Sequence, residues 1–517
     1  MRILLPCTLV LTVATASAQW DPTHGQWGKT APSDVRVMTF NVLDAICSTN
    51  TKNSATNNWA ACARIIAAMR PDVLLLQECG DNNGNGTGSS IDSVAQLTTA
   101  IDMFLHGGSD TFHSGSPAIS AYVQAYAPGY DLPYVFVSSG NDGFNRNVIL
   151  SRFPFVDLNG DGKPTLSDIP NISADLYAPG GNGGIRGFMF AELDLPDPLY
   201  AGDLVIGNAH LKAGGASTSH DQRILAAKNV AYFVDHFYNG AGGTVPDPRG
   251  KIADSPPATS VLDVNTSIVL GGDWNEDEWG NGTIGPADWL ARAALFDPSD
   301  VDGTDRDGTD MTYDHAPEWF SGTLNTYQNS GYKDDYICWQ DSLVASRRAF
   351  QFDSGQTPAS ALPPELGNFG NATVVASDHR PVIVDLLLPA PLGCNDAAHD
   401  LGFAKAGSDG RFPRFAACGS LAGGGVATLT VSDCPPHAVV LGMLGVSATT
   451  WNMFDAVLVP QNPGVIGPLL ADANGTVSIP VVGGGGSFSI YVQWAVSDIG
   501  ASSGVSVSNA LRIDFLP

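Results

Sequence analysis

Polar residues stand at the ends of several short apolar runs in this chain, and their types suit chemistry on an anionic group. Asn41 ends V-R-V-M-T-F-N, Glu78 ends P-D-V-L-L-L-Q-E, and His210 ends V-I-G-N-A-H. Asp273 and Asn275 end S-I-V-L-G-G-D-W-N. Such runs are typical of buried strands. Side chains at the strand ends along one rim of a sheet can converge on a single pocket.

Two later segments add groups of the same kind. Asp335 lies in K-D-D-Y-I, and Asp378 and His379 lie in S-D-H-R-P-V. Each residue alone has an ordinary explanation, because Asp and Asn favour the turns that follow strands. As a set, they supply carboxylates for a hard divalent cation, imidazoles and amides. Phosphoryl chemistry can use this combination.

The elements that must position these groups alternate between strand-like and helix-like patterns. A helix is expected at Trp59–Met69, because its small and apolar residues recur on one face and Pro71 follows it. Short apolar runs bounded by Gly, Asp and Pro predict these strands: Val35–Val42, Val73–Leu76, Val205–Ala209, Ser267–Leu270, Tyr336–Trp339 and Val382–Leu388. Stretches rich in Asn, Gly, Ser and Asp are interpreted as surface loops: 80–92, 239–260 and 297–310.

The start of the chain has the pattern of an export signal. Arg2 precedes an apolar run over Ile3–Val13, and Ala16-Ser17-Ala18 follows. This order is typical of a signal peptide at residues 1–18, and the apolar run is too short to span a bilayer. We therefore expect a protein that is secreted or on the cell surface, without a transmembrane segment. Its 517 residues exceed one ordinary core, so two or more domains are expected.

The cysteines are expected to form disulfides after export. Removal of the signal peptide takes Cys7 away, and most of the remaining cysteines should pair in an oxidising compartment. Cys47 with Cys62 would close a short loop. Two of the three late cysteines would close another, and these are Cys394, Cys418 and Cys434. An odd count leaves at least one thiol free or intermolecular.

The charge of the chain bears on its substrate. The net charge is −27, from 25 Lys and Arg against 52 Asp and Glu. Such a surface repels the phosphate backbone of nucleic acids. Clustered carboxylates bind divalent cations instead, and a bound cation reverses the local field. The alternative interpretation is a feature for solubility or salt adaptation, so charge does not decide against hydrolysis.

A second metal motif follows Phe155, in D-L-N-G-D-G-K-P-T-L-S-D over residues 157–168. Oxygen ligands fall at positions one, three, five, seven (through the backbone carbonyl) and twelve of a Ca²⁺ loop: Asp157, Asn159, Asp161, Lys163 and Asp168. Gly162 at position six permits the sharp turn. Asp replaces the usual Glu at position twelve, so weak, extracellular-range affinity is expected. An acidic, turn-rich loop is the alternative.

Taken together, the motifs resemble those of the endonuclease/exonuclease/phosphatase superfamily. The matching segments, in the same order, are T-F-N-V, L-L-Q-E, A-H-L-K, G-D-W-N, D-D-Y-I and S-D-H-R-P-V. The resemblance covers about residues 35–388. It implies a four-layer α/β sandwich, in which two mixed β-sheets pack face to face between helices. It also implies hydrolysis of phosphoric esters with Mg²⁺ or Mn²⁺.

The resemblance assigns roles to the matching positions. Glu78 is similar to the main Mg²⁺ ligand, with Asn41 and Asp378 assisting it. Asp273 is similar to the residue that orients or deprotonates the attacking water. Asn275 matches the residue that holds a phosphate oxygen.

The histidines complete the implied site. His379 would hydrogen-bond the scissile phosphate, and Asp335 would fix its tautomer and favour its charged form. His210 resembles a second histidine near the leaving group or phosphate. The chain has A-H-L-K-A-G where repair members carry an N-x-Y-x-P-N segment. The A-H-L-K segment and the following D-Q-R-I-L-A-A are similar to secreted nucleases and sphingomyelinase-type members.

Composition changes near the end of this region. Residues 389–393, P-A-P-L-G, are the linker candidate between a catalytic domain at 19–388 and a smaller domain at 394–517. Gly, Val, Ser and Ala dominate the last part, and the alternation from Phe488 to Val496 predicts a half-buried strand. We expect a small β-sandwich there. Its Gly/Val-rich sequence resembles β-domains that end secreted bacterial proteins, so cell-surface attachment and a structural appendage are both open.

Three functions follow from these observations. The first is an extracellular nuclease that acts on nucleic acid. The second is a sphingomyelinase-type phospholipid phosphodiesterase or another phosphatase, which an exposed aromatic hairpin would favour. Trp319-Phe320 is the nearest candidate for such a hairpin, and buried core is its simpler interpretation. The third is a non-catalytic surface-binding protein, which would need a broken site.

Overall fold

The computed structural model describes residues 24–29, 31, 33–46, 51–80, 91–141, 145–156, 166–169, 188–196, 199–233, 265–280, 282, 284–291, 311–329, 331–341, 343–389, 398–405, 407–408 and 412–517. The predicted signal peptide, most of the predicted loops and the predicted linker after Pro389 lie outside these ranges. So do four of the five predicted Ca²⁺ ligands: Asp157, Asn159, Asp161 and Lys163. Asp168 lies in a short strand and pairs with Met189.

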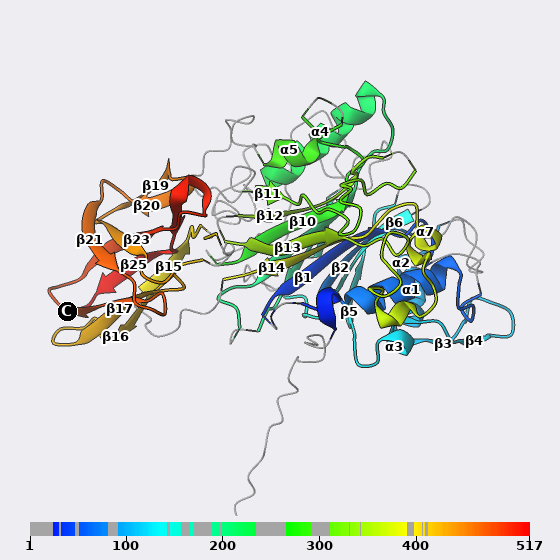
Figure 1. The fold of residues 1–517 in the computed structure, drawn as a ribbon, viewed down its shortest axis with the longest axis horizontal. Coiled ribbons are helices and arrows are strands. Elements are labelled where there is room, and N and C mark those ends of the chain that lie inside the picture. The colour runs from blue at the N-terminus through cyan, green and yellow to red at the C-terminus, as the bar shows by residue number, and fades with distance from the viewer. Residues whose placement is uncertain are drawn as a thin grey trace, which may run out of the picture.

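Two six-stranded mixed sheets form the larger part of the molecule (Figure 1). The first has the spatial order β13 (Ala345–Gln351), β14 (Val382–Leu387), β1 (Val35–Asn41), β2 (Val73–Gly80), β6 (Asn145–Ser151) and β5 (Tyr134–Val137). The second has the order β11 (Met311–Tyr313), β12 (Asp335–Gln340), β10 (Ser267–Asp273), β9 (Leu204–His210), β8 (Phe188–Leu193) and β7 (Leu166–Ile169).

The two sheets share one pairing pattern. Each has a single parallel pair at its centre, β1 with β2 and β9 with β10. The other neighbours pair antiparallel. Parallel strands require both faces to be covered, and accordingly β1, β9 and β10 are buried along their whole length.

The sheets pack face to face through apolar side chains from both. Val37 and Leu75 of the first sheet share a buried cluster with Ile206 and Val269 of the second. The approach is close at Gly271, where an added Cβ would lie 2.7 Å from the Leu75 side chain. Interiors are packed to crystal-like density, so this position has no room for a side chain.

Helices cover the outer faces (Figure 1). Helices α1 (Asn58–Met69), α2 (Val94–His106), α3 (Val123–Tyr126) and α7 (Ala372–Ala376), with the 3₁₀ turn η6 (Pro364–Leu366), pack on the first sheet. Helices α4 (Ser217–Phe233) and α5 (Pro286–Leu290) pack on the second. Helix α1 begins where the Asn57 side chain accepts from the Ala60 amide, a normal N-cap. The four-layer α/β sandwich is therefore confirmed, as are the predicted strands and the first helix. The remaining short elements of this part are η2 (Gly25–Trp27), β3 (Gly108–Ser109) and β4 (Ala118–Ile119).

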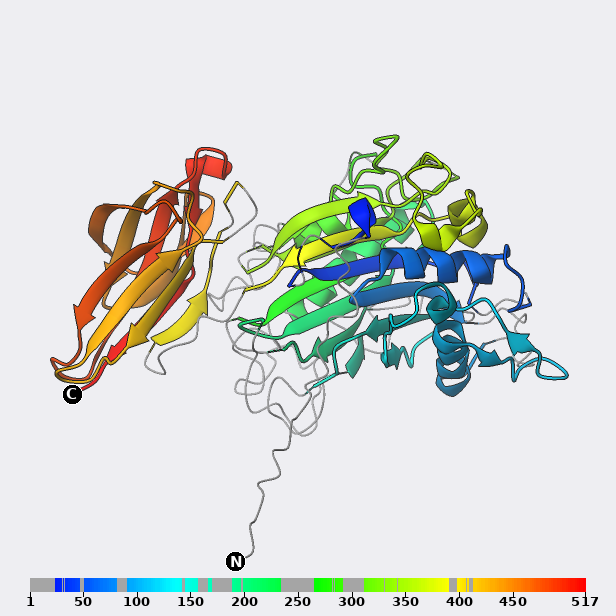
Figure 2. The ribbon, with the colours of Figure 1, turned by 60° about the horizontal axis from the view of Figure 1, so that its bottom comes forward.

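Among the residues that the structure describes, the strands from residue 398 onward pair only with one another (Figure 2). One sheet has the order β15 (Ala398–Gly402), β25 (Ala510–Phe515), β23 (Phe488–Ser497), β18 (Val439–Gly445) and β21 (Gly464–Leu470), and β24 (Val505–Val507) adds to β23. The second sheet contains β16 (Arg414–Gly419), β17 (Val426–Ser432) and β22 (Val477–Val482). A separate two-stranded sheet pairs β19 (Ala448–Met453) with β20 (Ala456–Pro460). A 3₁₀ turn, η7 (Ser502–Gly504), precedes β24. Trp494 and Phe415 pack between the two larger sheets, so the predicted β-sandwich is confirmed.

The cysteine prediction is partly wrong. Cys62, expected to pair with Cys47, carries a free thiol, as do Cys338 and Cys434. Cys62 lies on the buried face of α1, and burial raises its pKa well above the usual range. The helix therefore uses this cysteine as a small apolar core residue. Cys418 is disulfide-bonded.

No helix among the described residues is long and apolar enough to cross a membrane. Trp319 of the candidate aromatic hairpin stacks on Trp27 at 5.1 Å and on Phe350 at 4.2 Å between ring centroids. It therefore belongs to the packing of the first sheet, and Phe320 beside it is 41% exposed.

Candidate functional site

The two sheets bring polar side chains together at the rim where their central strands end. Asn41 is the last residue of β1 and Asp273 is the last residue of β10. The Asn41 Nδ2 atom donates to Asp273 Oδ2 across 2.9 Å, so the two strand ends meet. The register of the second sheet places His210 of β9 and Asp335 of β12 on either side of Asp273.

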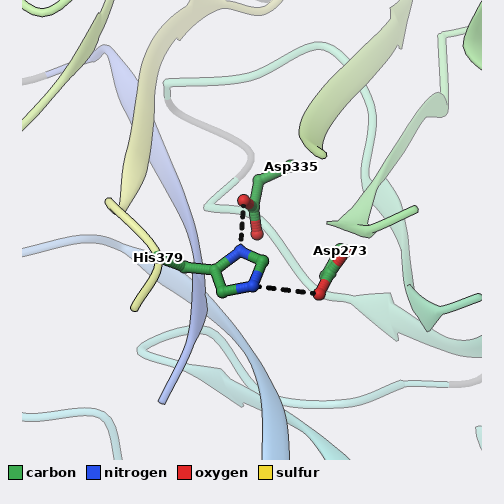
Figure 3. A group of neighbouring side chains, drawn as sticks. All are labelled: Asp273, Asp335 and His379. Carbon is green, nitrogen blue, oxygen red and sulfur yellow. Dashed lines mark hydrogen bonds and ion pairs between the residues drawn. The ribbon is translucent and has the colours of Figure 1, made fainter. Parts of the chain in front are cut away.

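His379 enters this group from the turn between α7 and β14 (Figure 3). Its Nδ1 atom lies 2.8 Å from Asp335 Oδ2, and its Nε2 atom lies 3.7 Å from Asp273 Oδ2. The ring packs against that of Tyr327, with centroids 5.0 Å apart. The histidine is thus fixed on one side by a carboxylate and on one face by an aromatic ring.

The surroundings perturb the acids and bases of the site. Burial by itself would lower the pKa of His379, but Asp335 and Asp273 outweigh it and raise the pKa well above the usual value. Burial raises the pKa of Asp273 too, Asp335 adds to the effect, and the His379 charge opposes it. These shifts favour the charged imidazole of His379, and they bring the pKa of Asp273 toward the neutral range, which suits a general base.

A β-bulge turns Glu78 toward the same rim. The pairing of β2 with β6 shifts register between Leu76 and Cys79, and Glu78 within this irregularity has a φ of 55°. A bulge re-aims a side chain that regular pleating would send to the other face. The Glu78 Oε1 atom lies 3.8 Å from His210 Nε2, and that nitrogen lies 3.4 Å from Asp273 Oδ2.

The turn after β10 is built for close approach. Gly272 has a φ of 142°, and an added Cβ would collide with the Ala209 carbonyl of β9. Two residues later, the Asn275 amide donates to Asp273 Oδ1 across 3.0 Å, and Asn275 itself has a φ of 55°. Its Nδ2 donates to the Leu211 carbonyl at 3.3 Å. Asn is one of the few residues other than Gly that adopts this left-handed conformation readily.

An open cavity of about 800 Å³ lies over the cluster. Of the predicted site residues, it is lined by Glu78, His210, Asp273, Asn275, Asp378 and His379. Asn41 and Asp335 are buried beneath these and contact them from behind. The structure therefore brings all eight predicted site residues of the larger part to one place.

The cavity wall also holds residues that the motifs did not single out: His220, Arg223, Glu276, Asp277, Tyr327, Tyr332 and Asp334. Burial raises the pKa of Asp334 to about 7, and its neighbour Asp335 adds to the effect. The doubled Asp of K-D-D-Y was the available signal for Asp334. Arg223 lies in the D-Q-R-I-L-A-A segment, whose resemblance to secreted nucleases and sphingomyelinase-type members was the available signal for it. The remaining residues lie on loops and on α4, where their spacing carries no pattern.

A buried amide pair joins the sheets just behind the site. The Gln77 Nε2 atom donates to Asn208 Oδ1 at 2.8 Å. The Asn208 Nδ2 atom donates to the carbonyls of Leu76 and Val148, at 3.0 and 2.9 Å. Gln77 directly precedes Glu78, so this contact sets the spacing between the two halves of the site. Buried polar groups that are satisfied in this way specify one packing arrangement.

The donor set fits a hard divalent cation. Glu78 and Asp378 point carboxylates at the cavity, with side chains 20% and 25% exposed, and Mg²⁺ prefers oxygen ligands. Burial is the main cause of the raised pKa of Asp273, and the neighbouring carboxylates that add to it carry the charge that a cation would neutralise. The Asn41 Oδ1 atom accepts from the Leu43 amide at 3.0 Å, so its amide orients Asp273.

Asp273, Asp335 and His379 place one ligand atom each within 4.8 Å of one another, which is a metal-compatible spacing. The short contact between His379 and Asp335 argues for an acid–base pair instead. A protonated imidazole cannot ligate a metal, and hard cations favour oxygen over nitrogen. The carboxylates of Glu78 and Asp378 are therefore the better ligands.

Solved structures with a similar fold exist. An endonuclease/exonuclease/phosphatase from Beutenbergia cavernae is 19% identical, with 92% of this chain and 99% of that chain covered and a TM-score of 0.37. The catalytic domain of human Nocturnin, solved with bound sulfate, is 14% identical over 69% and 95%, with a TM-score of 0.36. Sphingomyelinase C from Streptomyces griseocarneus is 14% identical over 68% and 99%, with a TM-score of 0.31.

By sequence, no family description matches the chain, and no curated protein is significantly similar to it.

Proposed function

We propose that this chain is a divalent-metal-dependent phosphodiester hydrolase of the endonuclease/exonuclease/phosphatase superfamily. The observation that supports this proposal is the contact of Asp273 with Asn41 and with two histidines at one cavity. Residues separated by more than two hundred positions meet there, as between Asn41 and Asp273. The supporting fold and the six ordered motifs agree with the same interpretation.

Glu78 and Asp378, with Asn41 nearby, would hold the cation, Mg²⁺ or Mn²⁺. When bound, it supplies positive charge that offsets the charge of the phosphate. His379, kept cationic by Asp335, donates from Nε2 to a phosphate oxygen from another direction. Asn275 supplies an amide for the same purpose.

Asp273 acts as the general base on the attacking water. Its carboxylate is oriented by the Asn41 side chain and the Asn275 backbone amide, which leaves little freedom of rotation. A base with a pKa near the working pH transfers protons efficiently. Asp334 lies in the same cavity and adds to the negative field that favours both the cation and the imidazolium.

The first candidate for the substrate is a nucleic acid, cleaved outside the cell. An open cavity accommodates a chain that passes through it, and the packed position of Trp319 removes the main feature that would favour membrane entry. A sphingomyelinase-type phospholipid substrate is the second candidate, and the acidic charge of the chain favours it over a polyanion. The C-terminal sandwich would then serve surface attachment or stability.

A substrate panel tests the proposal. Duplex DNA, RNA, sphingomyelin vesicles and bis(4-nitrophenyl) phosphate are each incubated with Mg²⁺, Mn²⁺ or chelator. Hydrolysis of at least one substrate, dependent on metal and lost in Asp273→Asn and His379→Ala, supports the proposal. His106→Ala, on the exposed end of α2, is the matched control and should retain activity. Activity that survives both substitutions in the cavity would overturn the assignment.

A further inference from the structure

The cavity contains another carboxylate–imidazole pair, His220 with Glu276, which comes from different elements than His379. His220 lies in the first turn of α4, and its Nδ1 atom is 3.1 Å from Glu276 Oε1. Glu276 directly follows Asn275. His379 comes from the turn before β14 of the first sheet, whereas His220 comes from the helix that covers the second. Both histidines line the same cavity.

The pair is fixed from behind by Arg223. The guanidinium of Arg223 pairs with Glu276 Oε2, and it donates to the carbonyls of Lys212 and Gly214 at 2.6 and 3.0 Å. The side chains of Arg223 and Glu276 are 4% and 5% exposed, so the carboxylate has little freedom to turn away from His220. Because this buried ion pair makes further hydrogen bonds to the backbone, Glu276 holds the His220 ring in one orientation.

His220 itself faces the cavity. Its side chain is 26% exposed, in contrast to 2% for His210, which lies between the carboxylates of Glu78 and Asp273. Within the part of the chain that the structure describes, the Nε2 atom of His220 has no hydrogen-bond partner from the protein. When the ring carries both protons, Nδ1–H is donated to Glu276 and Nε2–H remains for a molecule in the cavity.

We propose that His220 is a catalytic residue that protonates the leaving group, and that Glu276 and Arg223 are its positioning residues. This inference rests on the proposed hydrolase function. The oxygen of the attacking water forms the new bond to phosphorus, and its proton passes to Asp273. The bond from phosphorus to the leaving oxygen breaks, and that oxygen keeps the electron pair and takes the Nε2 proton of His220. Asp273 then releases its proton to solvent, and His220 regains one.

A proton donor at this position also indicates the class of substrate. An acid at this position matters for an alkoxide leaving group, such as that of a sugar or another alcohol, because a poor leaving group needs a proton to depart. It matters little for a leaving group that is stable as an anion. The natural substrate is therefore a diester between phosphate and an aliphatic alcohol.

The experiment measures how the loss of His220 depends on the leaving group. Methyl 4-nitrophenyl phosphate and methyl phenyl phosphate share the transferred group and differ in the acidity of the phenol. In His220→Gln, we expect kcat/KM to fall about 10²-fold or more for the phenyl ester and less than about threefold for the 4-nitrophenyl ester. Glu276→Gln should show the same dependence to a smaller degree.

The controls separate the possible failures. Asp221→Asn changes an exposed residue next to His220 on α4 and should leave both rates unchanged. Equal losses for the two esters in His220→Gln, in a variant with unaltered melting temperature, would show a structural role and overturn the inference alone. Failure of the wild-type protein to hydrolyse either ester or any substrate of the panel would instead contradict the proposed function, and the inference with it.

Discussion

Strand β1 has a buried charge cluster at each end, and the two clusters differ in how their charges are paired. At its start, Asp385 accepts from Arg36 at 2.6 and 2.9 Å and from Arg348 at 2.9 and 2.8 Å. At its other end, Asn41 contacts Asp273 in a group that also contains Asp335. There the imidazole of His379, not an arginine, supplies the positive charge next to Asp335.

The pKa shifts follow this difference. Burial would raise the pKa of Asp385, but the two arginines outweigh it and the pKa lies below the usual value. Burial also raises the pKa of Asp273, and the neighbouring carboxylates leave that increase in place. The anionic form of an aspartate is thus stabilised at one end of the strand, in Asp385, and destabilised at the other, in Asp273. Complete pairing stabilises the fold, and incomplete pairing beside a cavity leaves charge available for a ligand.

The largest expected effect separates activity from stability. Asp273→Asn removes the proposed base and one of the crowded carboxyl groups, so kcat should fall about 10³-fold or more while KM changes little. The melting temperature should stay equal or rise, because repulsion is relieved. Steady-state kinetics and thermal unfolding on the same preparation measure both. A variant that unfolds at lower temperature in proportion to its lost activity would contradict this distinction.

The converse change is Asp385→Asn. It leaves the buried guanidinium of Arg36 and the partly buried guanidinium of Arg348 without their carboxylate, which costs about 3–5 kcal/mol of unfolding free energy. The folded fraction should keep the kcat of the wild-type protein, because the cavity is at the other end of β1. Urea denaturation gives the free energy of unfolding, and hydrolysis rates divided by the concentration of folded protein give the activity. A stability loss below about 1 kcal/mol would show that the pairing contributes little.

Metal addition should stabilise the open cluster specifically. A cation that binds only the folded state adds about 2.7 kcal/mol at a hundredfold excess over its Kd. We expect Mg²⁺ or Mn²⁺ to raise the melting temperature by several degrees, and Glu78→Gln to remove most of the increase. His106→Ala should respond as the wild type does. An equal increase in Glu78→Gln would place the cation elsewhere.

The decrease of the unfolding free energy in acid should report on the ion pairs of Asp385. The pKa of Asp385 in the folded protein is below its unfolded value, so its contribution is present above about pH 4 and is lost as the pH falls through the folded value. The difference in stability between the wild type and Asp385→Asn should therefore be constant at neutral pH and shrink below pH 4. Denaturant titrations across this range measure it, and a difference that persists in strong acid would contradict the assignment.

The smallest expected effect concerns the separate Ca²⁺ loop predicted at residues 157–168. Calorimetric titration of chelator-treated protein should show weak Ca²⁺ binding that depends on Asp157 and Asp161. Replacing both with Asn should abolish the heat signal and leave hydrolysis unchanged. Absence of binding to the wild-type protein would make this segment an ordinary acidic loop.

The sequence carried most of the information about where the site lies. Buried strands with continuous apolar runs are recognisable without a structure, and several of them end at or near a residue that the fold brings to the site, as with Asn41, Glu78 and Asp273. The predicted ends of the strands lie within a few residues of the observed ends. The packing of two mixed sheets followed from the resemblance rather than from periodicity.

Other features were not predictable from local patterns. The bulge that re-aims Glu78 depends on the pairing of β2 with β6, and the Gln77–Asn208 contact depends on how two sheets dock. His220 became a candidate only when α4 was placed beside Glu276. The predicted pairing of Cys47 with Cys62 failed because it assumed that export decides pairing, whereas the burial of Cys62 against α7 is decided by packing.

The contact between Asn41 and Asp273 joins the last residue of one sheet's central strand to that of the other. Neither sheet by itself contains all of the proposed catalytic groups, so a chain that has formed both sheets without docking them would lack the proposed activity. Recovery of hydrolysis during refolding would accordingly trail the recovery of secondary structure, and its rate would measure the closure of the two halves.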